Sequence, residues 1–316
     1  MTPCRAAVRC LLAVLVCSGI SWILKSQPAG QERQYTIRTT ARLVLLDVSV
    51  KSATGDLVGG LSKENFEVRE NGNLQQITEF AHADMPVTVG LVVDESGSMR
   101  HKQPDVITAA LVFIGASNPQ DEIFVINFNE KARRGLPDIQ LFSDNLSQLR
   151  DALWRGVPQG RTALYDAVEM ALHQLDFGRR DKKTLIVISD GGDNVSATSL
   201  PQITREVLET VATIYTIGIY DDDDPDKNPA VLNRIAHISG GGAYFPKTLD
   251  EIAPICREIA KDIRSRYTIG YVPPAAEKTS ERHVKVSATS ADGKRLVVRT
   301  RTRYLFTPDN DGQGSR

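Results

Sequence analysis

The sequence predicts an α/β fold, in which a doubly wound, mainly parallel sheet carries helices on both faces and is flanked by a β-sandwich built from both ends of the chain. In the middle of the chain, short apolar runs alternate with longer helical runs, which is typical of a parallel sheet covered on both faces. On either side of this region, polar and apolar residues alternate with period two, which indicates strands. With 316 residues, 41% of them hydrophobic, the chain can bury a core of this size.

Residues 1–30 have the pattern of an export signal. Arg5 and Arg9 precede an apolar run, Leu11–Leu24, and Pro28-Ala29-Gly30 offers small residues for cleavage. The run is shorter than the roughly 20 residues that a membrane-spanning helix needs. We therefore expect a secreted or extracytoplasmic protein of the cell envelope, with an uncleaved membrane anchor as the alternative.

Net charge and cysteine usage exclude two classes of function. The formal net charge of −1 does not indicate a surface for polyanions, so nucleic acid is not an expected partner. Only Cys256 lies outside the N-terminal segment, and a single cysteine forms neither an internal disulfide nor a cysteine-based zinc site. We expect Cys256 to be a small core residue.

The segments 31–84 and 266–306 both read as β-structure. Each contains strand patterns and a hairpin signal, Asn71-Gly72 in the first and Asp292-Gly293 in the second. Neither segment is large enough to form a stable core alone. We expect one β-sandwich assembled from both, with separate extensions of the central sheet as the alternative, and a disordered tail over 307–316. The expected strands are Arg42–Val50, Phe66–Gly72, Gln75–Phe80, Tyr267–Val272, His283–Thr289 and Lys294–Tyr304.

The segment 85–265 alternates strands and helices. The expected strands are Val87–Val93, Asp121–Phe128, Ile139–Phe142, Lys183–Asp190, Ile214–Ile219 and Ala243–Phe245. The expected helices are Pro104–Ser117, Leu146–Trp154, Ala163–Leu175, Gln202–Val211, Ala230–Ile238 and Leu249–Arg264. In such a fold, ligands bind at the carboxyl ends of the strands.

Three polar loops are expected to meet at those ends. The first carries Asp94, Ser96 and Ser98, the second carries Thr162, and the third begins with Asp190. Both acids, Asp94 and Asp190, directly end buried strands, where a carboxylate is costly unless it is paired or coordinated. Because the loops supply hydroxyls and carboxylates without a histidine or thiolate, they suit a hard cation, Mg²⁺ or Mn²⁺ rather than Zn²⁺.

The residues of these loops resemble the metal-ion-dependent adhesion site of the von Willebrand factor A (VWA) domain. Asp94-Glu95-Ser96-Gly97-Ser98 matches the D-x-S-x-S signature, and Thr162 and Asp190 match the threonine and aspartate of the later loops. The resemblance covers roughly residues 86–264. The segment from Gly60 to Val68 is also similar to one in bacterial VWA-related proteins, although Asn65 stands where aspartate is commoner.

The resemblance implies a Rossmann-like domain that binds without catalysis. In this family the two serine hydroxyls coordinate the ion directly, while the threonine and the aspartates bind it directly or through water. The implied metal ligands are Asp94, Ser96, Ser98, Thr162 and Asp190. A coordination position left to water can accept a carboxylate, so the implied partner is a protein that presents an Asp or Glu, and no catalytic residue is expected.

Two other functions remain open from the sequence. A Mg²⁺-dependent phosphatase-like hydrolase also ends its first strand in an aspartate, but it needs a second acid where this chain has Ser96. A structural assembly module with a non-functional metal site would retain the same fold. Asp193, in the third loop, is interpreted either as an indirect support of the ion or as an ordinary loop acid.

Overall fold

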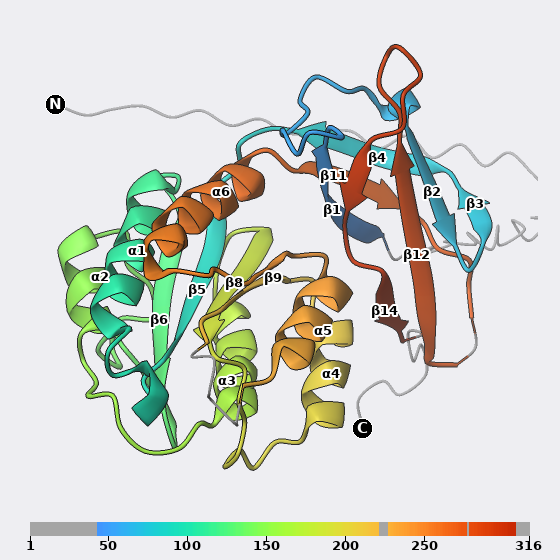
Figure 1. Ribbon diagram of the computed structural model, residues 1–316. Coiled ribbons are helices and arrows are strands. Elements are labelled where there is room, and N and C mark those ends of the chain that lie inside the picture. Colours follow the sequence, from blue (N-terminus) through green and yellow to red (C-terminus); the bar gives the residue numbers. More distant parts are fainter. Residues whose placement is uncertain (1–42, 221–226, 277, 308–316) are drawn as a thin grey trace, which may run out of the picture. The chain divides into compact units, whose positions relative to one another are not determined.

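The computed structural model describes residues 43–220, 227–276 and 278–307 (Figure 1). These residues belong to one compact unit, Ala41–Arg316. The expected export signal or anchor, residues 1–30, and nearly all of the expected disordered tail lie outside the described residues. Within the described part of the chain, no helix combines the length and the apolar character that crossing a membrane requires.

The central sheet has six strands, and its strand order confirms the predicted mainly parallel architecture. The order is β10-β9-β8-β5-β6-β7, and only β7 runs antiparallel to its neighbour. Every residue of the central strand β5 is buried, as expected for a sheet covered on both faces. The strands are β5 (Val87–Asp94), β6 (Glu122–Phe128), β7 (Ala132–Arg134), β8 (Lys182–Ser189), β9 (Thr213–Gly218) and β10 (Ala243–Tyr244).

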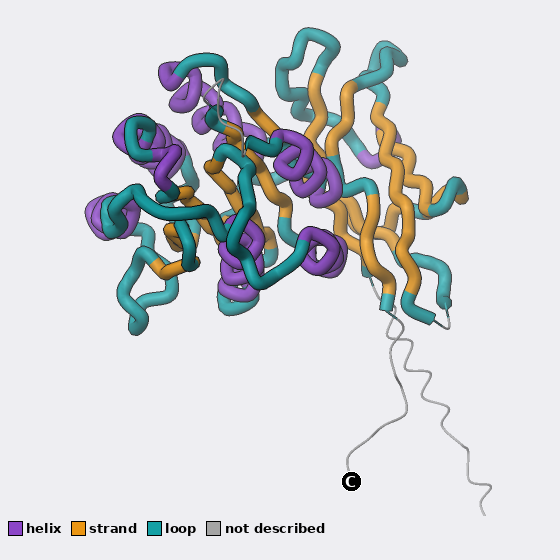
Figure 2. Tube along the Cα trace, turned by 60° about the horizontal axis from the view of Figure 1, so that its bottom comes forward, coloured by secondary structure: helices purple, strands orange, loops and turns teal. Residues whose placement is uncertain are grey.

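Helices pack on both faces of this sheet (Figures 1 and 2). One group consists of α1, α2 and α6, in which α1 contacts the other two helices. The other group consists of α3, α4 and α5, in which α4 contacts the other two. The helices are α1 (Gln103–Ala116), α2 (Leu146–Leu153), α3 (Leu164–Leu175), α4 (Leu200–Glu209), α5 (Pro229–Ser239) and α6 (Ile252–Arg264). Short 3-10 helices span Lys63–Asn65, Gly97–Met99 and Leu249–Glu251.

The predicted strand Ile139–Phe142 is wrong. Ile139 is 98% exposed, and the backbone N–H of Gln140 closes a turn on the carbonyl of Pro137 at 2.9 Å. The alternating apolar residues that suggested a strand are therefore part of a loop. The edge strand is instead β7, which returns on β6 immediately after it and which the sequence pattern did not reveal.

The two ends of the chain form the predicted β-sandwich. One sheet has the order β13-β1-β11-β4 and the other β14-β12-β2-β3, so each sheet combines strands from both ends. Side chains from both sheets share one hydrophobic core, and neither sheet extends the central one. The strands are β1 (Val44–Lys51), β2 (Phe66–Glu70), β3 (Asn73–Gln75), β4 (Ile77–His82), β11 (Tyr267–Tyr271), β12 (Ser280–Ala288), β13 (Val297–Arg299) and β14 (Arg303–Phe306).

Two of the predicted flanking strands are each divided between the two sheets. After the Asn71-Gly72 turn, whose φ angles are 48° and 86°, β3 pairs with β2, but β4 crosses to the other sheet and pairs with β11. The predicted strand Lys294–Tyr304 likewise becomes β13 on one sheet and β14 on the other. Period-two alternation marks an extended chain but not the sheet to which it belongs.

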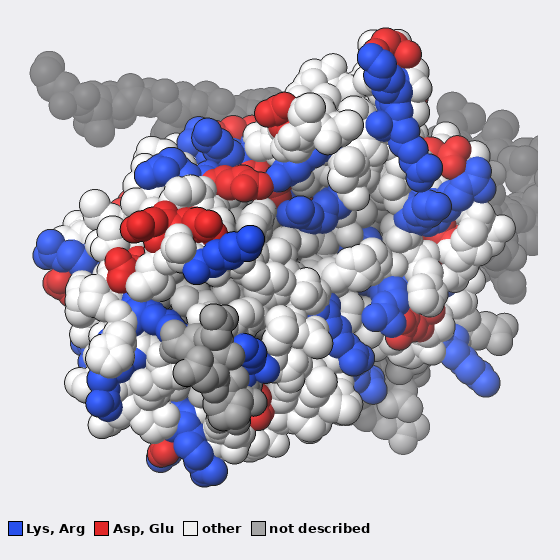
Figure 3. Space-filling model, in the orientation of Figure 1, with Lys and Arg blue, Asp and Glu red and all other residues white. Residues whose placement is uncertain are grey.

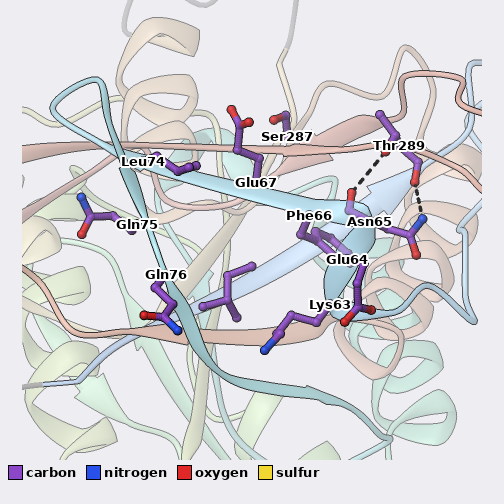
Figure 4. A pocket seen from close by; sticks show the side chains of 11 residues that line it. Lys63, Glu64, Asn65, Phe66, Glu67, Leu74, Gln75, Gln76, Ser287 and Thr289 are labelled. Atoms are coloured by element: carbon purple, nitrogen blue, oxygen red, sulfur yellow. Dashed lines mark hydrogen bonds between the residues drawn. The ribbon is translucent and has the colours of Figure 1, made fainter.

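Asn65 joins the two ends of the chain at a groove of about 500 Å³ beside β2 (Figure 4). Its side-chain oxygen accepts the N–H of Ser62 at 2.9 Å, while its amide nitrogen donates to the carbonyl of Thr289 at 3.0 Å. An ionised aspartate could accept the first hydrogen bond but could not donate the second. The asparagine at this position therefore adds a link between β2 and the end of β12.

The two connections between the sandwich and the central sheet are tied together. Asp84, between β4 and β5, pairs with Arg264 at the end of α6 at 2.6 Å. Arg266, which is buried, pairs with Asp262 at 3.1 Å and donates to the carbonyl of Asp47 on β1 at 3.2 Å. The side chain of Asp262 also accepts the hydroxyl of Ser49 on β1.

A buried charged group lies inside the sandwich. Glu70, 3% exposed, accepts a 2.5 Å hydrogen bond from Arg282 and the hydroxyls of Tyr271 and Tyr304 at 2.7 and 2.6 Å. The guanidinium of Arg282 also lies 3.9 Å from the ring centroid of Phe306. A buried carboxylate with these partners is fully hydrogen-bonded, and it depends on each of them.

We predict that Arg282→Met lowers the free energy of unfolding by roughly 3–5 kcal/mol, because it leaves the charge of Glu70 buried without its cation. Urea unfolding at neutral pH measures this. The control is Arg303→Met, which removes the partly exposed pair between Arg303 and Glu281 and should cost about 1 kcal/mol or less. Equal losses in the two variants would contradict the assigned importance of the buried pair.

Candidate metal centre

The five predicted metal ligands lie on three neighbouring loops at the carboxyl edge of the central sheet. Asp94 is the last residue of β5, and Asp190 directly follows β8. Because β5 and β8 are adjacent parallel strands, with Val93 opposite Ile188, the two acids leave the sheet side by side. Thr162 lies just before α3. Strand order alone thus places the acids of two separate loops next to each other.

Four of the predicted side chains belong to one hydrogen-bonded group. The hydroxyl of Ser98 donates to Oδ2 of Asp190 at 2.6 Å, and the hydroxyl oxygens of Ser96 and Ser98 are 3.0 Å apart. The backbone N–H of Ser96 donates to Oδ1 of Asp94 at 2.8 Å. Asp94, Ser96 and Asp190 are buried, and Ser98 is half-buried. The oxygen atoms of two loops are therefore gathered in one place.

The loop that carries Thr162 is joined to both of the other loops by hydrogen bonds. The N–H of Gly97 donates to the carbonyl of Gly160 at 3.0 Å, which connects the first loop with the second. Asn194 connects the second with the third: its N–H donates to the carbonyl of Thr162 at 3.1 Å, and its side chain accepts the N–H of Thr162 at 3.0 Å. Thr162 itself is buried.

The electrostatics of this group fit a divalent cation. Burial, together with repulsion from the Asp190 carboxylate, raises the pKa of Asp94 to about 7. A cation beside the two carboxylates would replace their repulsion with attraction and restore the ionised form of Asp94. Carboxylate and hydroxyl oxygens are donors that Mg²⁺ and Mn²⁺ accept. The residues present therefore match the chemistry of the ion that the sequence predicts.

Ser189 is a member of this group that the sequence analysis missed. Its hydroxyl donates to Oδ2 of Asp94 at 2.6 Å and accepts the N–H of Gly191 at 3.0 Å. Ser189 is the last residue of β8 and is fully buried, so it fixes the Asp94 carboxylate from the neighbouring strand. The sequence signal that could have indicated this role is the position of Ser189 directly before Asp190.

Asp193 supports the second loop through α3. Its Oδ1 accepts the N–H of Leu164, the first residue of α3, at 2.9 Å and the hydroxyl of Ser196 at 2.6 Å. Asp166 makes the reciprocal contact, because it accepts the N–H groups of Ala197 and Thr198 at 3.0 and 2.8 Å. Asp193 and Asp166 therefore tie the third loop to the start of α3.

Glu95, between the matched residues Asp94 and Ser96, points away from them. Its carboxylate is 0% exposed and forms a 2.9 Å ion pair with Arg133 of β7, whose side chain is 46% exposed. A Cβ added to Gly156 would lie 1.5 Å from Oε2 of Glu95, so any larger residue there would force the Glu95 side chain to shift. Burial raises the pKa of Glu95, and Arg133 opposes this increase. This pair anchors the first loop to the edge of the sheet.

The central part of the sequence matches a family model. Residues 89–192 match the model of the von Willebrand factor type A domain. This range includes all five predicted ligands: Asp94, Ser96, Ser98, Thr162 and Asp190. A comparison with the curated proteins gives no match.

Several solved structures are similar to the chain. A von Willebrand factor type A protein from Catenulispora acidiphila is 17% identical, with a TM-score of 0.51 over 85% of this chain and 74% of that one. The von Willebrand factor domain of the type V pilus tip protein Mfa5 from Porphyromonas gingivalis is 15% identical, with a TM-score of 0.48 over 57% and 95%. A mussel byssus matrix protein with a zinc-occupied adhesion motif is 16% identical, with a TM-score of 0.44 over 58% and 49%. The first of these supports the fold of this chain.

We predict that Gly156→Ala destabilises the protein by roughly 1–3 kcal/mol, because the added methyl group overlaps the buried carboxylate of Glu95, which must then shift. Thermal unfolding monitored by circular dichroism measures this. Gly115→Ala in α1 is the matched control, since nothing lies within 4 Å of the added carbon, and it should leave stability equal or higher. Wild-type stability of Gly156→Ala would refute the close packing of Glu95 on Gly156.

Proposed function

We propose that this protein, whose residues 89–192 match the model of the von Willebrand factor type A domain, is a binding protein that holds a divalent cation. The proposed ligands are Asp94, Ser96, Ser98, Thr162 and Asp190. The observation that carries the proposal is the meeting of two buried carboxylates with two serine hydroxyls at the carboxyl ends of β5 and β8. The preferred ion is Mg²⁺ or Mn²⁺, because all of the proposed donors are hard oxygen atoms.

The charge of the proposed site favours a carboxylate partner. The ionised forms of Asp94 and Asp190 balance a divalent cation, and hydroxyl ligands add no charge. When bound there, the ion would supply a coordination position for a carboxylate oxygen from an Asp or Glu of another protein. Lys and Arg are interspersed with Asp and Glu on the face drawn in Figure 3, so that face provides no strong single-sign attraction. Recognition would then depend on the metal site and its immediate rim.

The surrounding residues would orient the site without taking part in a reaction. Ser189 holds the Asp94 carboxylate, and Asn194 holds the backbone of Thr162. His101, the histidine closest in sequence to the first loop, is exposed. We therefore assign no catalytic residue and propose adhesion rather than hydrolysis.

The proposal extends to domain organisation and location. Residues 85–265 would form the binding domain, and the segments 31–84 and 266–306 would form its support. The basic and apolar pattern of residues 1–30 is consistent with a secreted or envelope-associated protein or with membrane attachment through this segment. Such a location would expose the metal site to partners outside the cytoplasm.

We predict that Asp94→Ala and Ser98→Ala each weaken Mg²⁺ or Mn²⁺ binding at least about tenfold, because each removes a proposed ligand. Isothermal titration calorimetry on metal-free protein measures the affinity, with circular dichroism to verify folding. Ser147→Ala, in the exposed first turn of α2, is the control and should bind as the wild type does. Wild-type affinity in both site variants would exclude this site.

We predict that peptides selected from a random display library in the presence of Mg²⁺ contain an essential Asp or Glu. Replacing that residue by Asn or Gln, adding EDTA, or using Asp94→Ala should each abolish binding, because the contact is a carboxylate on the ion. Binding that survives chelation and both site substitutions would overturn the proposal. Release of phosphate from p-nitrophenyl phosphate, lost in Asp94→Asn, would instead support the phosphatase-like alternative.

A further inference from the structure

A second group of metal-binding side chains lies between two helices of the central domain. Glu169 and His173 are four residues apart on α3, so they lie on the same face of that helix. Glu206 reaches them from the neighbouring helix α4. One potential ligand atom from each of the three residues lies within 4.8 Å of the other two. None of these residues belongs to the three loops described above.

One carboxylate oxygen of this group lacks a hydrogen-bond partner among the described residues. Glu169 accepts the hydroxyl of Thr198 at 2.6 Å. Glu206 as a whole is half-buried, but its Oε2 atom is inaccessible and accepts no hydrogen bond from the described residues. Within the same part of the chain, no lysine or arginine forms an ion pair with either glutamate. A buried carboxylate oxygen without a partner is costly and is normally paired or coordinated.

The two carboxylates and the imidazole lie together between α3 and α4. Two carboxylates that face each other are stabilised either by a shared proton or by a bound cation. The imidazole beside them distinguishes this group from a simple pair of acids, because it supplies a nitrogen ligand.

We propose that Glu169, His173 and Glu206 form a second metal site, which takes Zn²⁺ or a similar transition-metal ion. Zinc is commonly bound by histidine nitrogen and carboxylate oxygen, and three protein ligands leave a fourth position for water. The nitrogen ligand favours such an ion over Mg²⁺. With bonds of about 2.0–2.2 Å, tetrahedral ligands lie roughly 3.5 Å apart. His173 is exposed, so its imidazole has room to move closer to the two carboxylates.

A metal ion at this position would cross-link α3 and α4. Helix α3 begins just after Thr162, and Thr198, which donates to Glu169, immediately precedes the N-cap residue of α4. The ion would therefore stabilise the helices that follow the second and third loops. This second site stands independently of the proposed adhesion function, because it uses different residues and a different class of metal ion.

The test is to count the zinc ions bound by the full chain and by four variants, using calorimetric titration with ZnCl₂. Asp94→Ala removes the first proposed site and should still bind one zinc ion in the second. Adding His173→Ala or Glu206→Gln to Asp94→Ala should weaken the binding of that zinc ion at least about tenfold. His237→Ala, an exposed histidine on α5, is the matched control in the same background and should have no effect.

A second readout separates coordination from an effect on folding. In NMR spectra of the Asp94→Ala protein, one equivalent of zinc should shift the imidazole resonances of His173 and leave those of His237 unchanged. The proposal is overturned if the Asp94→Ala protein binds no zinc, or if His173→Ala and Glu206→Gln do not weaken binding. In that case the two glutamates share a proton, and any zinc bound by the wild type occupies the Asp94 loops.

Discussion

The structure of the proposed site depends on one constraint, which is that two buried carboxylates end adjacent parallel strands. The ladder between β5 and β8 ends at Val93 and Ile188, which brings Asp94 and Asp190 out of the sheet side by side. Their repulsion must therefore be balanced locally, and hydroxyl donors from Ser98 and Ser189 do part of this. A divalent cation would complete the balance. The two buried carboxylates, which are costly for the fold, are thus also the groups that best suit a bound cation.

The second constraint is that the loops are held mainly by side chains that are not themselves proposed ligands. Asp193 accepts the first N–H of α3, Asp166 of α3 accepts two N–H groups of the third loop, and Asn194 pairs with Thr162 in both directions. Such hydrogen bonds fix backbone positions and leave the hydroxyl oxygens of the ligand residues available. The adhesion signature therefore describes only part of the site, since the residues that orient it lie outside the signature.

Much of the fold could be predicted from sequence because its elements have strong local patterns. The apolar run of β5 and the Asn71-Gly72 turn are read directly from residue types. Sheet switching between β3 and β4 has no such local signal, because an extended chain has the same pattern in either sheet. The contact of Glu95 with Arg133 and Gly156 joins three distant segments, so only the folded chain reveals it.

The route of the chain through the sandwich determines how tension would pass through the molecule. The central domain is connected through β4 and β11, which are antiparallel neighbours, and the Asp84–Arg264 pair ties these connections. Force applied to the central domain by a bound partner would be transmitted to β4 and β11 together, so neither connection would carry the whole load. The two strands of the sandwich would then share that load.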